Sequence, residues 1–411
     1  MKDRVFIRRK REKPQADTVR EPARSLPIIA RCDVAVVGAG IAGVAAALAA
    51  SRNDAKVILI EKENMCGGLA TLGMVLWYLP LCDGNGRQVM AGIAEELLKT
   101  SLRYGPGKIP DAWQEGGDIV ERKKNRYRLL FNPAAFACAL DELLLESRVE
   151  IMFDTRFCGV IKKKQGAISS LIVENKSGRS AVECCMAIDA SGDADLCDAA
   201  GEAVSLFAWN RLSAWFYYCK DGEIKLFSGG EGRYLDPPRR GERVYNGLSW
   251  NDVSQINLDT RKLLLSKLEE IRQGKKDSEV YPVTIPSLPL FRMTRRLKGR
   301  YVLGEADVKR RFHDSIGVIG DWRKPGPIFF LPFRLLAGVK TPNLLTAGRT
   351  ISTTVAMWDM TRVIPVCAVT GQAAGTAAAL AVSTGKTVGT IDIRKLQEML
   401  LAQGVLLSPR F

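Results

Sequence analysis

Three glycines and one glutamate near the start of the chain have the types and spacing needed to hold the phosphates and a ribose of a dinucleotide. Gly38, Gly40 and Gly43 stand in G-x-G-x-x-G spacing, and Glu61 follows 23 residues after the first of them. The first glycine permits a tight turn, the second lets a pyrophosphate approach the backbone, and the third lets a helix pack closely on the preceding strand. A carboxylate at the position of Glu61 can accept hydrogen bonds from both ribose hydroxyls of an adenosine. These residues predict that the chain binds a dinucleotide.

The surrounding segments predict the elements that position these residues. Residues 33–61 read as a buried strand, the glycine turn, an alanine-rich helix and a second strand that ends at Glu61. Such a helix directs its free N–H groups and the positive end of its dipole at the phosphates. A coincidental glycine-rich turn in another α/β unit is the alternative, and the matching offsets of all four pieces argue against it.

Composition and cysteine usage bound the class of protein. A chain of 411 residues with 46% hydrophobic and 26% charged residues is typical of a globular protein with two or three lobes. The ten cysteines include no C-x-x-C pair and no zinc-finger spacing, which favours buried thiols in a reducing cytoplasm over a redox dithiol or a metal site. The apolar stretch 34–50 carries the glycine fingerprint, so we interpret it as a folded turn rather than a signal peptide. We therefore expect a cytoplasmic protein without membrane insertion.

The net charge of +15 is unevenly distributed. Residues 1–30 hold nine Lys/Arg against four acids, and residues 292–311 hold eight Lys/Arg against two acids. Such clusters can attract nucleic acid, an anionic membrane surface or an acidic substrate. Solvated faces that aid solubility are the alternative.

Patterns further along the chain predict additional elements. Amphipathic spacing predicts helices over 90–104 and 133–147, and alternation over 149–153, 157–162 and 168–174 predicts a β meander. Small residues then follow two short buried strands, and a Pro-capped helix of small residues runs from near Pro365 to about Thr384. The intervening segment is aromatic, rich in Pro and Gly, and without a second G-x-G-x-x-G, so we expect a substrate lobe there.

Together these pieces resemble the FAD-dependent oxidoreductases of the glutathione-reductase-type FAD fold, whose relatives include fumarate reductase flavoproteins. The resemblance extends over residues 20–385 and rests on five motifs in order: the glycine fingerprint, Gly-Gly-Leu-Ala-Thr (67–71), Asp-Ala-Ser-Gly-Asp (189–193), Leu-Leu-Thr-Ala-Gly-Arg (344–349) and Gly-Gln-Ala-Ala-Gly-Thr (371–376). It implies an α/β fold in which a Rossmann-like FAD-binding domain carries an inserted β-rich substrate lobe. The resemblance, and not the fingerprint alone, favours FAD over NAD.

The resemblance also implies a division of the chain and a set of cofactor contacts. The division is a basic arm (1–19), a first part of the FAD-binding domain (20–204, with an insert at about 75–130), a substrate lobe (205–330), a second part of the FAD-binding domain (331–390) and a tail (391–411). The expected contacts are Gly38, Ala39, Gly40, Ala42 and Gly43 at the pyrophosphate, Glu61 at the ribose, Lys62, Phe157 and Cys158 near the adenine, and Gly67 and Gly68 against ribose and pyrophosphate. Leu69, Ala70 and Thr71 would line the flavin, Ala190, Ser191 and Gly192 would pass under the nucleotide, and Gly348 and Arg349 would approach the pyrophosphate and ribityl chain. Gly371, Gln372 and Ala373 would form the N-terminus of the last helix and direct its dipole at the flavin. Close packing is the alternative role for each small residue.

Candidates for the chemistry itself are two arginines. Arg362 precedes the last helix, where relatives in the fumarate reductase branch bring an arginine to a substrate carboxylate, and a bidentate guanidinium suits that contact. Its alternatives are capping of backbone carbonyls or contact with a flavin oxygen. Arg295 and Arg296 could grip an anionic substrate or make ion pairs, so Arg296 is the second candidate. His313 is the single histidine and stands in a basic loop, where an incidental role is the alternative to acid–base catalysis.

These residues lead to a functional hypothesis. A hydride would move between a small organic substrate, with anions among the candidates, and flavin N5, while the protein positions both. With one nucleotide fingerprint, a separate electron donor or acceptor must regenerate the flavin. A tRNA-directed flavoprotein, suggested by the basic clusters, and a protein that uses FAD structurally are the two rivals. Homo-oligomerisation stays open.

Overall fold

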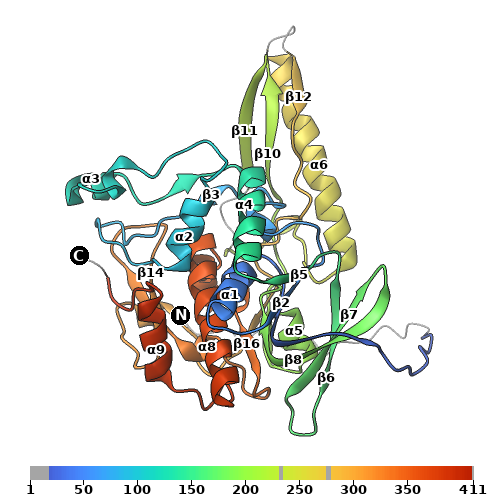
Figure 1. Ribbon diagram of the computed structural model, residues 1–411. Helices are drawn as coiled ribbons and strands as arrows, with labels where there is room; N and C mark the ends of the chain where they lie inside the picture. The colour runs from blue at the N-terminus through green and yellow to red at the C-terminus, as the bar shows by residue number, and fades with distance from the viewer. Residues whose placement is uncertain (1–17, 231–234, 275–278, 410–411) are drawn as a thin grey trace.

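A seven-stranded sheet forms the centre of the molecule, which we describe from a computed structural model covering residues 18–230, 235–274 and 279–409 (Figure 1). Its strands lie in the order β5-β2-β1-β8-β7-β6, with β16 beside β8. The strands are β1 (Ile28–Val37), β2 (Val57–Ile60), β5 (Glu150–Met152), β6 (Arg156–Lys162), β7 (Ile168–Asn175), β8 (Gly178–Asp189) and β16 (Leu344–Thr346). Most of the predicted arm 1–19, and residues 410–411 of the predicted tail, lie outside the described residues.

The sheet is parallel where the dinucleotide turn leaves it. β1 pairs in parallel with β2 and β8, and β16 pairs in parallel with the end of β8. β6, β7 and β8 form an antiparallel meander, as the sequence predicts. The prediction that 149–153 begins this meander is wrong, because β5 pairs in parallel with β2. Alternation within one short strand does not say which neighbour it joins. The predicted α/β fold class is confirmed.

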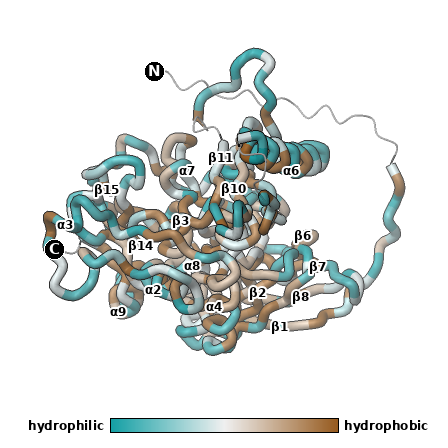
Figure 2. Tube along the Cα trace, turned by 90° about the horizontal axis from the view of Figure 1, so that it is seen from above, coloured by the Kyte–Doolittle hydropathy of each residue, from teal (hydrophilic) through white to brown (hydrophobic). Residues whose placement is uncertain are grey.

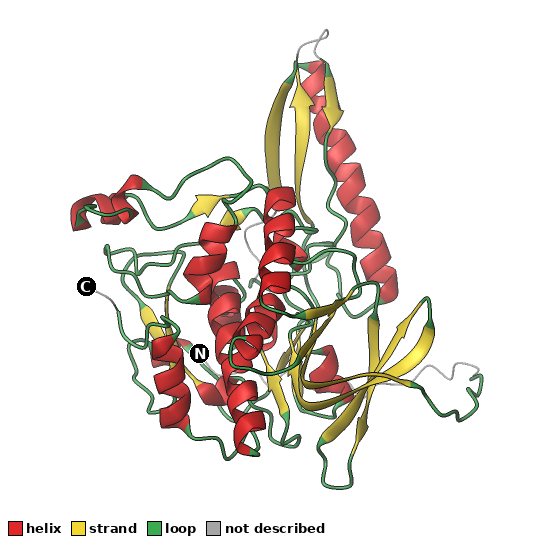
Figure 3. Ribbon diagram, viewed as in Figure 1, coloured by secondary structure: helices red, strands yellow, loops and turns green. Residues whose placement is uncertain are grey.

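Two helices of small residues pack against each other and against this sheet (Figure 3). They are α1 (Ile41–Ser51) and α8 (Ile364–Thr384). A Cβ on Gly371 would lie 2.2 Å from the carbonyl oxygen of Ala42, so glycine lets the two backbones approach closely. By length and composition α8 could cross a membrane, but 89% of its most apolar window is buried inside the molecule, as expected for a core helix.

Further helices and short strands surround this core. The predicted helices at 90–104 and 133–147 are confirmed as α2 (Ile93–Thr100) and α4 (Pro133–Glu146). The other short elements around the core are β3 (Trp77–Tyr78), α3 (Ile119–Lys124), β4 (Leu129–Leu130), α5 (Asp195–Ala199), α7 (Val355–Thr361) and α9 (Ile393–Ala402). Single 3₁₀ turns occur at η1 (Gly68–Ala70), η2 (Asp111–Trp113), η3 (Glu305–Asp307), η4 (Phe333–Leu335) and η5 (Gly348–Thr350).

A projection formed by a second sheet and one long helix stands away from the main sheet, at the top of Figure 1. It contains β10 (Ser213–Lys220), β11 (Glu223–Gly230), β12 (Val280–Pro282) and α6 (Trp250–Gln273). The buried residues of α6 are Ile256, Thr260, Leu264 and Leu268, each four positions apart, and much of the helix is hydrophilic (Figure 2). That spacing gives the helix one buried stripe. The sequence-based description of this lobe as β-rich missed α6.

Two small pairings connect the lobe to the cofactor side. β13 (Arg295–Leu297) pairs with β9 (Val204–Leu206), so the basic segment lies beside residues 204–206. β14 (Ser315–Gly320) and β15 (Ile328–Pro332) form a hairpin that contacts α8 and α9. Besides pairing with β9, β13 contacts η5, so the backbone of Arg296 lies near that turn.

Candidate functional site

The glycine turn contains two glycines that pack and one that faces open space. A Cβ on Gly38 would lie 2.5 Å from the carbonyl oxygen of Ala190, and one on Gly43 would lie 1.8 Å from that of Gly38. A Cβ on Gly40 would meet nothing within 4 Å. Gly40 is also the N-cap of α1 and provides no side-chain cap. The open space beside an uncapped helix N-terminus fits a phosphate group.

Glu61 lies at the end of β2 with its carboxylate turned back to the glycine turn. Its Oε2 accepts the N–H of Ala39 at 2.6 Å, and its Oε1 accepts the N–H of Glu63 at 2.9 Å. Burial raises the pKa of Glu61, and the two backbone N–H groups partly offset that rise. Each carboxylate oxygen retains capacity for a further donor such as a ribose hydroxyl. Lys62 beside it is exposed.

The loop after β2 lies directly against the glycine turn. The N–H of Gly67 donates to the carbonyl of Ala39 at 2.8 Å, and a Cβ on Gly68 would lie 3.1 Å from Cα of Gly40. Thr71 is buried and its hydroxyl donates to the carbonyl of Cys66 at 2.6 Å. The structure thus brings the loop 67–71, with Leu69 and Ala70, to the N-terminus of α1.

Two later turns approach the same region. A Cβ on Gly192 would lie 2.3 Å from Nη2 of Arg349, which stands 3.6 Å from Oδ1 of Asp193. The N–H of Gly348 donates to the hydroxyl of Thr370 at 3.0 Å. Ala190 is buried beneath Gly38, and Ser191 donates from its hydroxyl to Asp189. The predicted small-residue turns therefore meet at one place.

The predicted adenine contacts lie on the outer strand of the meander. Phe157 is half-buried and Cys158 is exposed on β6. The N–H of Thr155, just before β6, donates to the carbonyl of Glu61 at 2.9 Å. The start of β6 therefore lies beside the expected ribose residue.

The prediction that Gly371, Gln372 and Ala373 form the N-terminus of the last helix is wrong. α8 begins at Ile364, so these residues lie two turns inside it. Gly371 contacts α1, and Oε1 of Gln372 accepts the N–H of Ile93 at 2.8 Å. These residues therefore pack α8 against its neighbours. The spacing of Gly371 and Gly375 in the sequence does not distinguish this packing role from the start of a helix.

Arg362 is largely buried and already has an acidic partner. Its Nη2 lies 2.5 Å from Oδ1 of Asp359, and the two side chains are 10% and 7% exposed. Nη1 of Arg323 stands 3.6 Å from the other oxygen of Asp359. The charge of Arg362 is therefore compensated within the protein, which sequence reasoning did not foresee.

The adjacent arginines at 295 and 296 have different environments. Arg295 forms ion pairs with Asp195 and Asp198. Burial and the neighbouring carboxylate of Asp193 raise the pKa of Asp195 to about 6, and Arg295 opposes that rise. Arg296 is 7% exposed and makes no ion pair with any residue that the structure describes. The pair therefore divides into one structural arginine and one uncompensated charge.

Arg296 is held by a carbonyl and an aromatic ring. Its Nε donates to the carbonyl of Thr353 at 2.5 Å, and its guanidinium carbon lies 4.7 Å from the ring centroid of Trp358. Its Nη1 and the hydroxyl of Thr353 are both buried with no hydrogen-bond partner in the described part of the chain. Burial lowers the pKa of Arg296 to about 10, so the group stays cationic at neutral pH. Thr353 was not singled out from the sequence, because a buried hydroxyl has no local sequence signal. Trp358 stood out in the sequence only as a departure from relatives of the resembled family, which often carry a histidine there, and not as a partner of Arg296.

The remaining histidine lies apart from these groups. His313 is exposed, and its carbonyl accepts the side-chain amide of Gln397 on α9 at 2.9 Å. Among residues 18–230, 235–274 and 279–409, no three His, Cys, Asp or Glu side chains are grouped as metal ligands would be. The site therefore combines a nucleotide cradle with two buried arginines.

Comparison with known proteins gives one partial sequence relative and several remote structural ones. The 4-oxocyclohex-2-ene-1-carboxylate 5-dehydrogenase of Sinomonas cyclohexanicum is 37% identical over 86 residues, which is 21% of this chain and 14% of that protein. A p-nitrophenol 4-monooxygenase from Pseudomonas putida DLL-E4 is 11% identical with a TM-score of 0.48, covering 91% of this chain and 84% of that chain. A geranylgeranyl bacteriochlorophyll reductase-like protein from Thermoplasma acidophilum is 15% identical with a TM-score of 0.45, covering 92% and 84%.

The family comparison covers most of the chain. The family model for FAD dependent oxidoreductases matches residues 33–211 and 221–400. These ranges include the glycine turn, Glu61, both later turns and both arginines. The open cradle at Gly40 and the free acceptor capacity of Glu61 fit the cofactor. The chain therefore belongs to the FAD dependent oxidoreductase family, and it is an enzyme whose redox cofactor is FAD.

Proposed function

We propose that this oxidoreductase transfers a hydride between a small organic anion and N5 of the flavin, with Arg296 binding the anion. The observation that carries the proposal is the buried guanidinium of Arg296, whose Nη1 has no partner in the described chain. A buried charge without a counterion is costly, so a ligand that supplies the counterion gains correspondingly. The hydroxyl of Thr353 provides a second donor beside the same position.

The other residues have proposed roles in holding the cofactor. The glycine turn 38–43 and the loop 67–71 would hold the pyrophosphate and flavin side, with Glu61 at the ribose. The turns 190–192 and 348–349 would complete the cradle. Their mutual contacts and the open space at Gly40 support these assignments. When bound, FAD supplies the redox chemistry, and these residues supply position and electrostatics.

Arg362 remains a second candidate for substrate binding. Its ion pair with Asp359 favours a structural role, because a substrate carboxylate would compete with a carboxylate already in contact. An uncompensated guanidinium has no such competitor. We therefore assign the substrate anion to Arg296 and keep Arg362 as the alternative.

The substrate class can be narrowed by the partial relative. Its name contains a cyclic enone carboxylate, so cyclic carboxylates are the first compounds to test. Because the match covers 14% of that protein, the name suggests a class and not a compound. Since the chain has one nucleotide fingerprint, we further propose a separate electron donor or acceptor. We also propose a cytoplasmic location, because the ten cysteines are free thiols.

The rival RNA-directed function rested on two basic clusters, of which residues 1–17 lie outside the described part of the chain. Besides Arg295, Arg310 pairs with Asp307 at 3.1 Å and Nε of Arg300 donates to the carbonyl of Gly338 at 3.0 Å. Much of the basic cluster at 292–311 is therefore engaged within the protein, and we do not propose RNA as a partner.

Anaerobic flavin spectroscopy tests the proposal. Purified holoprotein is mixed with cyclic and linear carboxylates, each beside its amide, with FAD started both oxidised and reduced. We expect at least one carboxylate to change the flavin absorbance while its amide does not. Equal responses to acid and amide would contradict the role of Arg296. A spectrum that no compound changes would favour the structural use of FAD.

A further inference from the structure

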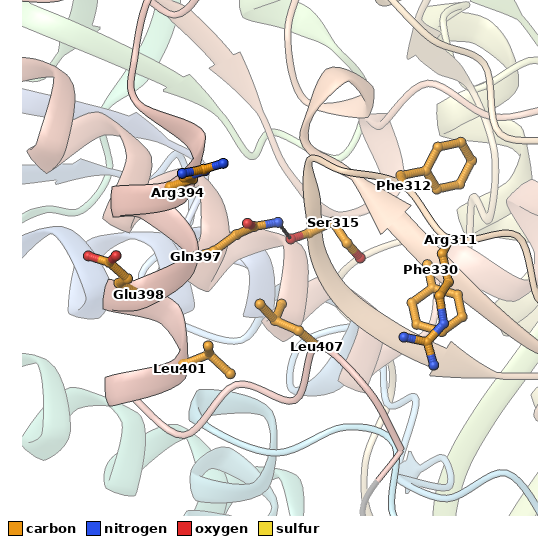
Figure 4. A pocket seen from close by; sticks show the side chains of 9 residues that line it. All are labelled: Arg311, Phe312, Ser315, Phe330, Arg394, Gln397, Glu398, Leu401 and Leu407. Carbon is orange, nitrogen blue, oxygen red and sulfur yellow. Dashed lines mark hydrogen bonds between the residues drawn. The ribbon is translucent and has the colours of Figure 1, made fainter.

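A second concave site lies between α9, the hairpin β14–β15 and the segment that follows α9 (Figure 4). Its cavity has a volume of about 360 Å³. Small-molecule sites in proteins typically measure about 300–1,000 Å³. None of its lining residues belongs to the proposed cofactor contacts or to the arginines of the proposed active site. The site is therefore independent of the function proposed above.

One side of this pocket is apolar. Phe330 on β15 and Leu407 after α9 face the cavity, and Leu401 on α9 and Phe312 before β14 extend this wall (Figure 4). Phe330 is buried, whereas Leu401 is 54% exposed at the mouth. Such a wall favours a ligand with an aromatic or branched aliphatic body.

Two guanidinium groups at the pocket have no acidic partner. Arg311 lies over the ring of Phe330, with 5.3 Å between its guanidinium carbon and the ring centroid, and Arg394 stands on the first turn of α9. Neither forms an ion pair with the residues that the structure describes. In contrast, the nearby Arg334 pairs with the buried Asp314 at 2.9 Å. Arg311 and Arg394 therefore bring uncompensated positive charge to the pocket, whereas the charge of the nearby Arg334 is compensated by Asp314.

The polar part of the pocket is fixed by hydrogen bonds between elements. The side-chain amide of Gln397 donates to the carbonyls of His313 and Ser315, at 2.9 Å and 3.0 Å. These bonds join α9 to the start of β14. The hydroxyl of Ser315 points away from Gln397, toward the side of the pocket where Phe330 lies (Figure 4). The pocket is thus formed by ordered elements and not by loop side chains alone.

The balance of charge selects the ligand. Arg311 and Arg394 face one acid, Glu398, among the lining residues, so the pocket carries one net positive charge. A single negative charge matches this balance better than two. We propose that this pocket is a second ligand site, which binds a monocarboxylate with an aromatic or branched aliphatic body.

A ligand-observed NMR titration of the FAD-loaded, full-length protein tests the proposal, with phenylacetate as the probe. For a ligand of this size we expect a dissociation constant on the order of 1 mM. Phenylacetamide, which keeps the ring but lacks the charge, should bind at least tenfold more weakly. The double variant Arg311→Gln/Arg394→Gln should weaken phenylacetate binding by about tenfold or more. Lys395→Gln, on the same helix turn but outside the pocket, should leave the affinity unchanged.

A second variant and a second probe keep the outcome decisive. Leu401→Trp, which adds bulk at the exposed mouth, should also block the probe while the flavin spectrum stays normal. Equal binding of acid and amide, or full binding in the double variant, would overturn the proposal. Loss of binding in Arg296→Met alone would place the probe in the active site and overturn it too. Phenyl phosphate binding tenfold tighter than phenylacetate would overturn the choice of a monocarboxylate.

Discussion

The nucleotide end of the proposed active site and its arginine end are built in different ways. At the nucleotide end, Gly38 and Gly43 meet backbone atoms at distances that exclude any side chain, and the space beside Gly40 stays open. At the arginine end, Arg362 has its carboxylate in place while Arg296 has none among the described residues. Backbone geometry thus shapes the cradle, whereas the arginine end contains one buried guanidinium without a counterion among the described residues.

The largest effect is expected at Gly43. In Gly43→Val the new Cβ would lie 1.8 Å from the carbonyl oxygen of Gly38, which is backbone and cannot move aside cheaply. We expect a loss of more than about 4 kcal/mol in the free energy of unfolding. Urea denaturation and the yield of folded protein measure it. A folded, yellow variant would show that the turn tolerates a side chain. The nucleotide end would then not depend on close backbone contacts at Gly43.

Gly40→Val should separate cofactor binding from folding. Because a Cβ there meets nothing within 4 Å, the apoprotein should lose only the cost of valine at the N-cap of α1, about 1 kcal/mol, relative to wild-type apoprotein. FAD binding should be lost, because the side chain enters the space for the pyrophosphate. The variant should then lack the stabilisation that bound FAD gives the holoprotein, about 4 kcal/mol at 1,000 times the dissociation constant. Chromatography after heat release measures FAD, and a variant with full FAD content would contradict the assignment.

The nucleotide end could be predicted from the sequence because its signals are local. The turn, α1, β2 and Glu61 lie within one stretch, and each glycine has a role set by its spacing. The partner of β5 and the role of Gly371 depended on which distant element lies alongside, so those two predictions failed. The buried stripe of α6, which includes Ile256 and Leu264, has a regular spacing of four residues in the sequence, but the sequence analysis did not identify it.

The arginine end could be predicted only in part, because its electrostatics depend on distant residues. From the sequence, Arg362 was the first candidate for the substrate anion and Arg296 the second. Arg362 finds Asp359 three positions away, but the Nε of Arg296 finds the carbonyl of Thr353 across 57 positions. A residue that is charged, buried and uncompensated can be recognised only when every neighbour is in place.

Arg362→Met should be moderately destabilising. It removes the partner of Asp359, which is 5% exposed, and so leaves a buried carboxylate with Arg323 as its remaining ion-pair partner. We expect a loss of about 3 kcal/mol in the free energy of unfolding. Arg103→Met is the control, because its ion pair with Glu142 is 45% and 44% exposed, and it should cost less than about 1 kcal/mol. An unchanged urea midpoint in Arg362→Met would show that its ion pair is not structural.

The smallest change in stability is expected for Arg296→Met. The variant loses the hydrogen bond to Thr353 and the contact with Trp358, but it also removes a buried charge that burial penalises. The free energy of unfolding without substrate should therefore stay within about 1 kcal/mol of wild type, or rise. Urea denaturation beside Arg362→Met compares the two. A loss as large as that of Arg362→Met would mean that Arg296 has a counterion in the protein, and the two arginines would then not differ in charge compensation.

The most direct test of the central claim is the rate of substrate-driven flavin reduction or oxidation, per bound FAD, in Arg296→Met. Rapid anaerobic mixing with the carboxylate identified from the compound series measures this rate, and Arg362→Met is measured in parallel. We expect normal FAD content in Arg296→Met and a rate lowered at least thirtyfold, since losing a buried charge-assisted contact costs about 2–5 kcal/mol. A wild-type rate in Arg296→Met, with the loss confined to Arg362→Met, would contradict this claim and assign the substrate to Arg362.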